Sequence, residues 1–315
     1  MKEKLKKITN SGFKDWNLSQ VPDLTGRNIF ITGGNAGLGL ETSKILIEKN
    51  ANILISSRSI EKAENAVTEI QKHGKAKVDF VQLDLSELKS VEQCSKDVKS
   101  KMPNIDIIIN NAGIMMTPQK NTKSGHELQL ATNHIGHFYL NSLLFDSLNK
   151  ETGRIVVVSS IAHKYGSINF DDLMLKNNYS PIRAYSQSKL ANLLYAFELD
   201  RKLKKANSKI TCIACHPGYS NTNLQSTGPT GASKFIMKFL NKIMAQHANS
   251  GAIPTVLAAV GKEAKPGAYY GPQGMSEMKG RVSDAKVAKK ALDTEVSKKL
   301  WEKTEELISN KFTIN

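Results

Sequence analysis

The sequence predicts a doubly wound α/β fold, in which one parallel sheet is covered by helices on both faces. Short runs rich in β-branched residues alternate with longer segments of helical periodicity along the first 215 residues. These runs are apolar nearly throughout, which is typical of strands buried on both faces. Because each strand is followed by a helix, right-handed crossovers and a parallel sheet are expected.

The individual elements follow from the same patterns in chain order. Strands are predicted at 28–32, 52–56, 78–83, 105–110, 154–159 and 209–215. Helices are predicted at 37–49, 60–72, 87–101, 125–148 and 183–206, and near 295–308. Residues 1–26 form a polar lead-in with Trp16 as its main apolar anchor. With no repeat or low-complexity linker visible, we expect an N-terminal extension over 1–26 and a single domain over 27–315.

The charge balance is strongly basic, with a formal net charge of +15 over 315 residues. Such a balance can indicate a nucleic-acid partner. Here the lysines are scattered, with denser groups at 2–7 and 286–290, and the chain has no arginine-rich block, zinc-finger spacing or aromatic RNA-binding signature. We therefore expect a lysine-coated surface and no nucleic-acid partner.

The cellular compartment is predicted by the cysteines and the N-terminus. Three cysteines are too few for a disulfide framework, so a reducing compartment is expected. The start M-K-E-K-L-K-K has no apolar core of a signal peptide, and no run of 18 apolar residues exists to span a membrane. These features predict a cytoplasmic protein without a membrane span.

One stretch, T-C-I-A-C-H-P-G at 211–218, contains the C-x-x-C-H spacing that attaches c-type haem. The stretch overlaps the predicted strand 209–215, and strand side chains three apart point to opposite faces. Cys212 and Cys215 therefore cannot readily reach one haem or one metal. They are predicted to be small buried packing residues, and no metal site is predicted.

A glycine-rich segment, T-G-G-N-A-G-L-G at 32–39, joins the first strand to the first helix. Glycine lets a backbone turn tightly and approach a pyrophosphate, and the N–H groups of the helix start can bind the phosphates. The alternative is a tight strand–helix turn without a ligand. The candidate cofactor-binding residues here are Gly33, Asn35, Gly37, Leu38 and Gly39.

The second strand ends in S-S-R at 56–58, where an NAD-binding site usually has an acid for the ribose 2′-hydroxyl. Ser57 occupies that position and Arg58 follows it. Because a serine and an arginine accept a 2′-phosphate that an acid would repel, NADP(H) is favoured over NAD(H). The alternative for Arg58 is a solvated side chain at a strand end.

Two more strand ends complete the predicted cofactor site, because ligands of open α/β sheets bind at the carboxyl ends of the strands. In L-D-L-S at 83–86, Asp84 can accept the adenine amino group, with Leu85 beside it, although Asp84 could equally cap the next helix. In N-N-A-G at 110–113, small residues let a cofactor lie against the backbone. The candidates there are Asn111, Ala112 and Gly113.

The segment Y-S-Q-S-K at 185–189 carries the candidate chemistry. Tyr185 and Lys189 are four residues apart on a predicted helix and share one face. A tyrosine with a pKa near 10 is a poor acid or base at neutrality, and an adjacent ammonium is expected to lower that pKa. Ser160, at the end of the fifth strand, can donate a hydrogen bond to a substrate oxygen. Taken alone, Y-x-x-x-K could also belong to a surface helix.

These motifs, with N-H-I-G-H-F at 133–138, V-S-S at 158–160 and H-P-G at 216–218, resemble the short-chain dehydrogenase/reductase family over about residues 24–225. The resemblance implies a Rossmann fold and hydride transfer. It implies that Tyr185 is the general acid/base, that Lys189 binds the nicotinamide ribose and that Ser160 orients the substrate oxygen. It further implies that Asn133 holds a water linked to Lys189. Contacts with the nicotinamide end are implied for Pro217, Gly218 and Thr222.

Segments on either side of Tyr185 narrow the resemblance to one branch of the family. The branch is the retinol dehydrogenase-like and protochlorophyllide reductase-like one, and the resemblance is carried by S-S-I-A-H-K-Y-G-S-I-N-F-D-D-L at 159–173, by the insertion that follows it before Tyr185, and by S-K-L-A-N-L-L-Y-A-F-E-L at 188–199. The segments 267–274 and 300–307 resemble bacterial relatives of that branch. The N-terminal apolar helix of its membrane-anchored members has no counterpart here, so a soluble enzyme is expected.

The substrate is predicted from the segment after the H-P-G motif. We assign 222–250 as a substrate lid region and 251–315 as a C-terminal extension. The stretch 233–244 combines apolar residues with lysines, so it could be an apolar lid, an ordinary core helix or a membrane-surface contact. A lid implies a hydrophobic aldehyde, ketone or alcohol, with His163 and Tyr165 at the mouth. An NADP(H)-dependent oxidoreductase is expected, as a possible homo-oligomer; the alternative is an NADP(H)-binding regulatory protein.

Overall fold

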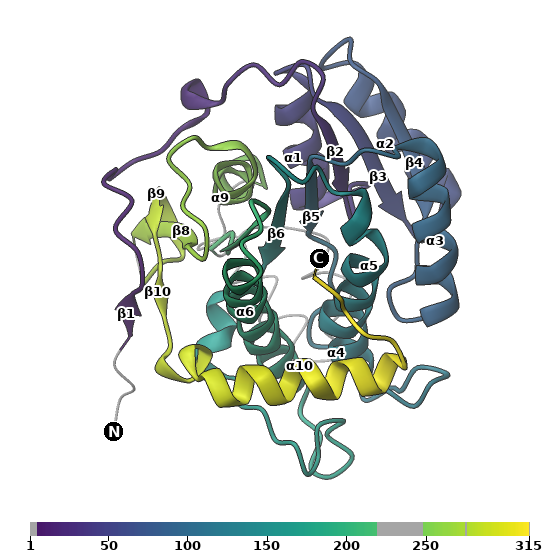
Figure 1. Cartoon of the computed structure of the whole chain (residues 1–315), viewed down its shortest axis with the longest axis vertical. Coiled ribbons are helices and arrows are strands. Elements are labelled where there is room, and N and C mark those ends of the chain that lie inside the picture. Colours follow the sequence, from purple (N-terminus) through teal and green to yellow (C-terminus); the bar gives the residue numbers. More distant parts are fainter. Residues whose placement is uncertain (1–4, 219–247, 275, 315) are drawn as a thin grey trace.

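The computed structural model describes residues 5–218, 248–274 and 276–314. Its central sheet has eight strands in the order β4-β3-β2-β5-β6-β7-β8-β9 (Figure 1). The strands are β2 (Asn28–Ile31), β3 (Asn52–Ser57), β4 (Val78–Gln82), β5 (Ile107–Asn110), β6 (Arg154–Val158), β7 (Thr211–Cys215), β8 (Tyr269–Gly274) and β9 (Lys279–Asp284). All neighbours pair in parallel except β8 and β9, which are antiparallel. The predicted doubly wound fold is confirmed.

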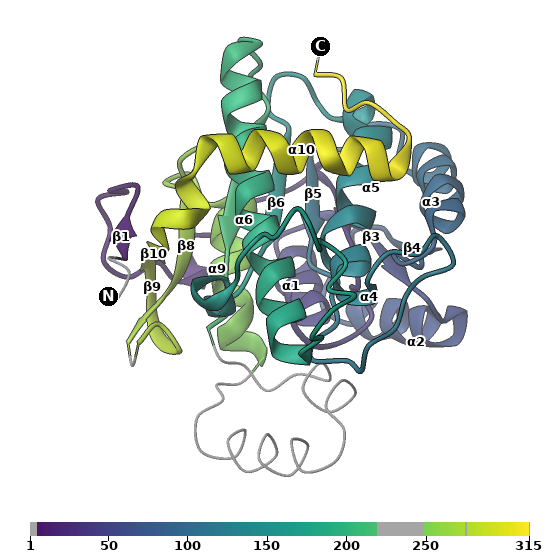
Figure 2. The ribbon, with the colours of Figure 1, turned by 90° about the horizontal axis from the view of Figure 1, so that it is seen from below.

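Helices cover both faces of the sheet. On one face α1 (Gly37–Ile47), α2 (Ile60–Gln71) and α9 (Ala248–Val260) enclose a core that contains Ile31, Ile55 and Val156. On the other face α3 (Leu88–Lys101), α5 (Gly136–Leu144), α6 (Pro181–Lys205) and α10 (Thr294–Ile308) enclose a second core. The C-terminal helix α10 crosses the outside of this second layer, next to α6 (Figure 2). Successive side chains of each strand point to opposite faces and pack into the two cores in turn, as the continuous apolar runs predicted.

One predicted helix is interrupted. The segment 125–148 consists of a short α4 (Leu128–Leu130), a π-helical turn η2 (Ala131–Ile135), α5 and a 3₁₀ turn η3 (Phe145–Ser147). The prediction of one continuous helix was therefore wrong, because a 3.6-residue periodicity does not reveal the wider turn. Further 3₁₀ segments are η1 (Leu18–Gln20), η4 (Ile161–Tyr165) and η5 (Lys289–Leu292).

The N-terminal segment is tied to the far edge of the sheet. A short β1 (Lys6–Lys7) pairs with β10 (Lys286–Val287) (Figure 1). The N–H of Trp16 donates to the carbonyl of Val282 in β9. The side chain of Trp16 is buried, as expected for its anchoring role, and its indole N–H donates to Glu263 at 3.0 Å.

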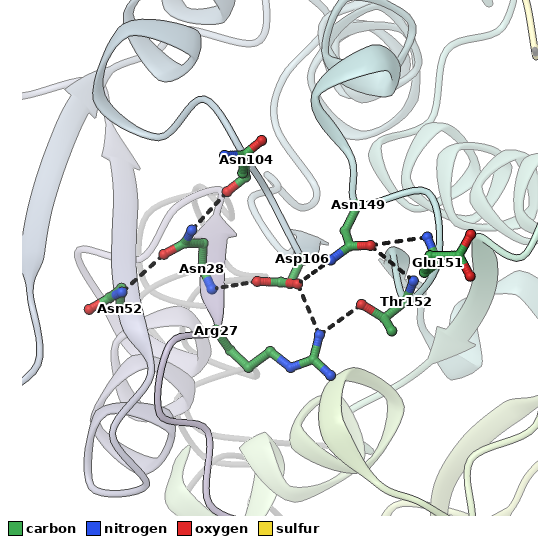
Figure 3. Close-up of polar contacts among 8 residues, drawn as sticks. All are labelled: Arg27, Asn28, Asn52, Asn104, Asp106, Asn149, Glu151 and Thr152. Carbon is green, nitrogen blue, oxygen red and sulfur yellow. Dashed lines mark hydrogen bonds and ion pairs between the residues drawn. The ribbon is translucent and has the colours of Figure 1, made fainter.

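A polar network closes the amino ends of the central strands, opposite the predicted ligand edge. Asp106 accepts the N–H of Asn28 at 2.9 Å, an Nδ2–H of Asn149 at 3.1 Å and the guanidinium of Arg27 at 2.9 Å (Figure 3). Its carboxylate therefore joins β2, the start of β5 and the turn before β6. This network stabilises the sheet far from the predicted site.

No helix in the described part of the chain is long and apolar enough to cross a membrane. Thr222 and the segment 233–244, to which a cofactor contact and a lid were assigned, lie outside the described residues.

Candidate functional site

A cavity of about 790 Å³ lies at the carboxyl ends of β2, β3, β5 and β6, where the fold class predicts a ligand. It is lined by thirteen of the predicted residues, namely Gly33, Asn35, Gly37, Leu38, Arg58, Asp84, Leu85, Asn111, Ala112, Gly113, Tyr185, Lys189 and Pro217. The fold thus brings the glycine-rich turn and the Y-S-Q-S-K helix to one cavity. Gly39, Asn133, Ser160 and Gly218 are not among the residues that line it.

The glycine-rich turn leaves the start of α1 open. The residue before the helix, Ala36, has no side chain that can cap it, so the first N–H groups of α1 remain available to a ligand. A Cβ atom at Gly39 would lie 2.4 Å from the carbonyl oxygen of Gly33 and 2.5 Å from Nδ2 of Asn111. Only glycine therefore allows this turn to pack under the cavity, and the combination fits a pyrophosphate.

The end of β5 is fastened to the end of β2. Oγ1 of Thr32 accepts the N–H groups of Asn111 and Ala112, both at 3.0 Å. The side chain of Asn111 donates back to the carbonyl oxygens of Thr32 and Gly33 at 2.9 and 3.3 Å. These contacts hold the N-N-A-G segment flat against the glycine-rich turn, so that its backbone forms part of the cavity wall.

Two cations lie where the 2′-phosphate of NADP was predicted. Arg58, just before α2, and Lys62, in its first turn, are both exposed and both line the cavity. Ser57 lines it as well, and its Oγ accepts the N–H of Ser59 at 3.2 Å. Lys62 was not predicted as a site residue, although a second basic residue four positions after Arg58 was a readable signal.

After the end of β4, Asp84 and Leu85 line the cavity. The carboxylate of Asp84 accepts the N–H and Oγ–H of Ser86 at 2.9 and 2.7 Å, which shapes the turn after β4. It does not cap α3, whose N-cap residue is Glu87. The alternative role of Asp84 as a helix cap is thus not observed.

Tyr185 and Lys189 lie one turn apart on α6 and are both buried. Lys189 Nζ donates to the carbonyl oxygen of Val158 at 3.2 Å and lies 5.8 Å from the centre of the Tyr185 ring. Burial raises the pKa of Tyr185 to about 12, against a smaller lowering by the Ser160 hydroxyl. Burial also lowers the pKa of Lys189 to about 8. The net shift of the tyrosine pKa is therefore upward, because desolvation outweighs the other influences on the phenol.

Ser160 is the N-cap residue of the 3₁₀ turn η4, and its Oγ accepts the N–H of Ala162 at 3.2 Å. His163, which was placed at the substrate mouth, is a residue of this turn and is fully buried. Its Nδ1 donates to the carbonyl of Ser160 at 2.7 Å, and its Nε2 accepts the N–H of Ala288 at 3.3 Å. The placement of His163 at the mouth was therefore wrong. Tyr165 is exposed.

Asn133 lies in the π-helical turn with its side chain turned to the segment after N-N-A-G. Its Oδ1 accepts the N–H of Ile114 at 2.8 Å, and its Nδ2 donates to the carbonyl of Ile114 at 2.9 Å and to Oγ of Ser188 at 2.9 Å. The side chain is thus fully engaged with protein groups, which connect the cavity wall to α6.

The H-P-G turn follows β7 directly. The N–H of Gly218 donates to Nδ1 of His216 at 3.1 Å, and Gly218 has a φ of +72°. A Cβ atom at Gly218 would lie 2.3 Å from the carbonyl oxygen of Met278, so the turn requires glycine. Cys212 and Cys215 are buried in different cores on opposite faces of β7, which confirms that they cannot share one ligand.

Several lining residues had not been predicted. Besides Lys62, they are Ala36, Ser56, Leu83, Ile114, Met115, Thr117, Leu128, Thr132, Val158 and Ser159. Five of these ten lie inside the quoted motifs, three follow N-N-A-G by one to four residues, and the last two lie just before and within the π-helical turn. No spacing in the sequence distinguishes them, because their place depends on how the strand ends and the interrupted helix meet.

Comparisons with known proteins agree with this geometry. A family model described as short chain dehydrogenase matches residues 27–233. Short-chain dehydrogenase TIC 32 A, chloroplastic, of Brassica napus is 35% identical over 292 residues, covering 89% of this chain and 88% of the relative. Human retinol dehydrogenase 14 is 33% identical over 304 residues, covering 90% of this chain and 86% of the relative.

A solved structure supports the same assignment. An uncharacterized protein from Mycobacterium paratuberculosis superposes with a TM-score of 0.80 at 35% sequence identity, covering 96% of this chain and 100% of that one. The chain therefore belongs to the short-chain dehydrogenase family of oxidoreductases, in its retinol dehydrogenase-like branch.

Proposed function

We propose that the protein is an NADP(H)-dependent oxidoreductase that interconverts a hydrophobic aldehyde or ketone and its alcohol, with Tyr185 as general acid/base. The observation that carries the proposal is that Tyr185 and Lys189 line the same cavity as the glycine-rich turn. A phenol in the same cavity as a glycine-rich turn can exchange a proton with a substrate oxygen while the carbon bonded to that oxygen exchanges a hydride with a bound nicotinamide.

In the direction of reduction, NADPH would supply the hydride to the carbonyl carbon when bound in this cavity. Tyr185 supplies the proton to the carbonyl oxygen, and the pKa of about 12 keeps the phenol protonated at neutral pH. Ser160 holds the same oxygen through its hydroxyl hydrogen, since its Oγ already accepts the N–H of Ala162. The proton transfer thus neutralises the charge that develops on the oxygen.

Lys189 limits the cost of the phenolate that proton transfer leaves behind. Its ammonium lies 5.8 Å from the centre of the Tyr185 ring and is oriented by the carbonyl of Val158. With a pKa of about 8, the amine remains mostly charged at neutral pH. Its positive charge stabilises Tyr185 as an anion until a proton returns to it.

The preference for NADP(H) over NAD(H) is supported by the charges around the cavity. Arg58 and Lys62 line it at the end of β3 and the start of α2. Among the described lining residues the one acid is Asp84, which is engaged with Ser86. A phosphate would therefore meet two cations and no competing carboxylate next to them.

The class of substrate is supported by the wall of the cavity and by the relatives. Ile114, Met115 and Leu128 present apolar side chains to it. The name of the human relative, retinol dehydrogenase 14, is that of an enzyme for an apolar alcohol. The proposed location is the cytoplasm, on the argument from the three cysteines, which are all free and buried.

The test is to follow the NADPH absorbance band with a panel of apolar aldehydes and ketones, with NADH as the parallel cofactor. We expect turnover with NADPH and a much lower kcat/KM with NADH. Tight NADPH binding without turnover on any substrate would instead favour a cofactor-binding regulatory protein. Absence of NADPH binding would reject both.

A further inference from the structure

Thr32, at the carboxyl end of β2, receives two main-chain hydrogen bonds from the cavity wall. Its Oγ1 accepts the N–H groups of Asn111 and Ala112. The same atom lies 2.8 Å from Nε2 of His137, a residue of α5. Thr32 and His137 are both buried, so this contact is shielded from water.

The second ring nitrogen of His137 determines the direction of that contact. His137 Nδ1 lies 3.1 Å from the main-chain carbonyl oxygen of Asn133 in the π-helical turn. A carbonyl can only accept, so Nδ1 carries the hydrogen. Nε2 of the neutral ring is then an acceptor, and the Thr32 hydroxyl donates to it rather than to the Ile109 carbonyl at 3.3 Å. Burial lowers the pKa of His137 to about 4, which keeps the ring neutral.

The opposite end of the cavity wall is held by Asn133 itself. Its side chain bonds both the N–H and the carbonyl of Ile114. A closed ring of hydrogen bonds results. It runs from Thr32 through His137 to Asn133, across to Ile114, and back along the main chain to Ala112 and Thr32.

We propose that His137 is a positioning residue that closes this ring and holds the segment 111–114 in place against the cofactor and Tyr185. The proposal rests on the proposed function, because it assigns the segment 111–114 to cofactor binding. Without His137, Thr32 and Asn133 still hydrogen-bond the main chain of the segment 111–114, but no side chain connects them to each other. The segment could then shift at one end relative to the other, and misplacement near reacting groups is costly.

The test uses the full-length protein, four single variants and one double variant. His137→Phe keeps the ring shape and removes both hydrogen bonds, whereas His137→Gln keeps an amide that can accept from Thr32. Thr32→Val removes the hydroxyl from the other side of the contact. Asp106→Asn is the matched control, since it weakens a buried network at the opposite end of β5. Each is measured for NADPH affinity by fluorescence, for kcat and for thermal unfolding.

We expect His137→Phe to weaken NADPH binding and lower kcat, each about tenfold, the size expected for loss of a buried hydrogen bond. His137→Gln should recover part of both losses. Thr32→Val combined with His137→Phe should be no worse than the more severe single variant, because both break one ring. Asp106→Asn should lose thermal stability with NADPH affinity and kcat within about twofold of the parent, as for a distant structural contact.

Folded His137→Phe with unchanged affinity and kcat would overturn the proposal, as would strictly additive effects in the double variant. If His137→Phe does not fold, His137→Gln and Thr32→Val take its place. Unchanged NADPH affinity and kcat in both of these folded variants would then overturn the proposal. Hydrogen exchange of the Ala112 and Ile114 amides without cofactor separates this proposal from the proposed function. If His137 holds the segment in place, these amides should exchange faster in His137→Phe than in Asp106→Asn, even if the protein binds no NADPH. Equal exchange in the two variants would reject the role of His137.

Discussion

The side chain of Asn133 hydrogen-bonds both main-chain groups of Ile114. It accepts the N–H at 2.8 Å and donates to the carbonyl at 2.9 Å. The two residues are 19 apart in sequence, and the contact joins the π-helical turn to the wall of the cavity. A π turn is costly in a helix and is retained where the surroundings hold it. Here the hydrogen bonds between Asn133 and the cavity wall at Ile114 hold the π turn in place.

The isosteric substitution Asn133→Asp tests this contact. The carboxylate can still accept the Ile114 N–H but cannot donate to the Ile114 carbonyl or to Ser188. We expect kcat to fall at least about tenfold, because an oxygen then faces an oxygen in a buried site. Steady-state kinetics beside a thermal melt would check this, and kinetics equal to the parent's would contradict the role of this contact.

Tyr185→Phe removes the proposed acid and keeps the ring. We expect turnover to fall by roughly 10²–10⁴-fold, the usual contribution of a positioned acid or base. NADPH affinity should change little, because the aromatic ring still lines the cavity. Stopped assays with fluorescence titration of NADPH measure the two quantities separately. Retained turnover in the variant would reject Tyr185 as the acid.

Replacing Arg58 or Lys62 with alanine should weaken the preference for NADPH. Each loss removes a charge-assisted contact to the 2′-phosphate, for which about a tenfold rise in KM for NADPH is expected. KM for NADH should stay nearly constant, since NADH has no such phosphate. Lys72→Ala is the control, because Lys72 is an exposed lysine at the far end of α2. A rise in KM that is equal for both cofactors would show that neither cation reads the phosphate.

Gly39→Ala should weaken cofactor binding strongly and have a smaller effect on folding. The new methyl would lie 2.4 Å from the Gly33 carbonyl oxygen, so the glycine-rich turn must move. Gly125→Ala provides the comparison, because a Cβ there meets nothing within 4 Å although its φ is +80°. We expect at least about a tenfold loss of NADPH affinity for Gly39→Ala, since misplaced phosphate contacts are charge-assisted. Isothermal titration with NADPH measures the affinity, and an unchanged affinity would show that the turn does not bind the phosphates.

Stability should fall when the pH drops below about 6.5. Burial lowers the pKa of His134 to about 3 and that of His137 to about 4, both below the value of an unfolded histidine. The unfolded chain therefore takes up these protons first, and stability is lost as the pH falls from about 6.5 towards 4. Each residue should contribute about 1–2 kcal/mol of loss by pH 5.

Urea unfolding at pH 7 and pH 5 measures this loss. His137→Phe should reduce the difference between the two free energies of unfolding. An identical pH dependence in parent and His137→Phe would contradict the assignment.

Periodicity and apolar composition alone determined most of the sheet. The strands β2 to β7 lie within two residues of their predicted bounds, because buried parallel strands are continuous apolar runs that locally favour extended backbone. Strand β8 was not predicted, since its sequence Y-Y-G-P-Q-G is rich in turn residues and is strand only by pairing with β7 and β9. The local propensity of a segment does not show which distant strand will pair with it. The partner β7 ends at Cys215, more than 50 residues before β8 begins.

The chemistry of the site divides in the same way. The identity of Tyr185, Lys189 and the glycines could be read from the sequence, because backbone approach and acid/base chemistry require particular residue types at set spacings. Only the tertiary structure decided that His163 is buried, that Lys62 joins Arg58, and that His137 connects Thr32 to Asn133. Burial also makes the net shift of the Tyr185 pKa upward. Each of these depends on which distant groups are neighbours and on how much water they exclude, and neither quantity is a property of a local stretch of chain.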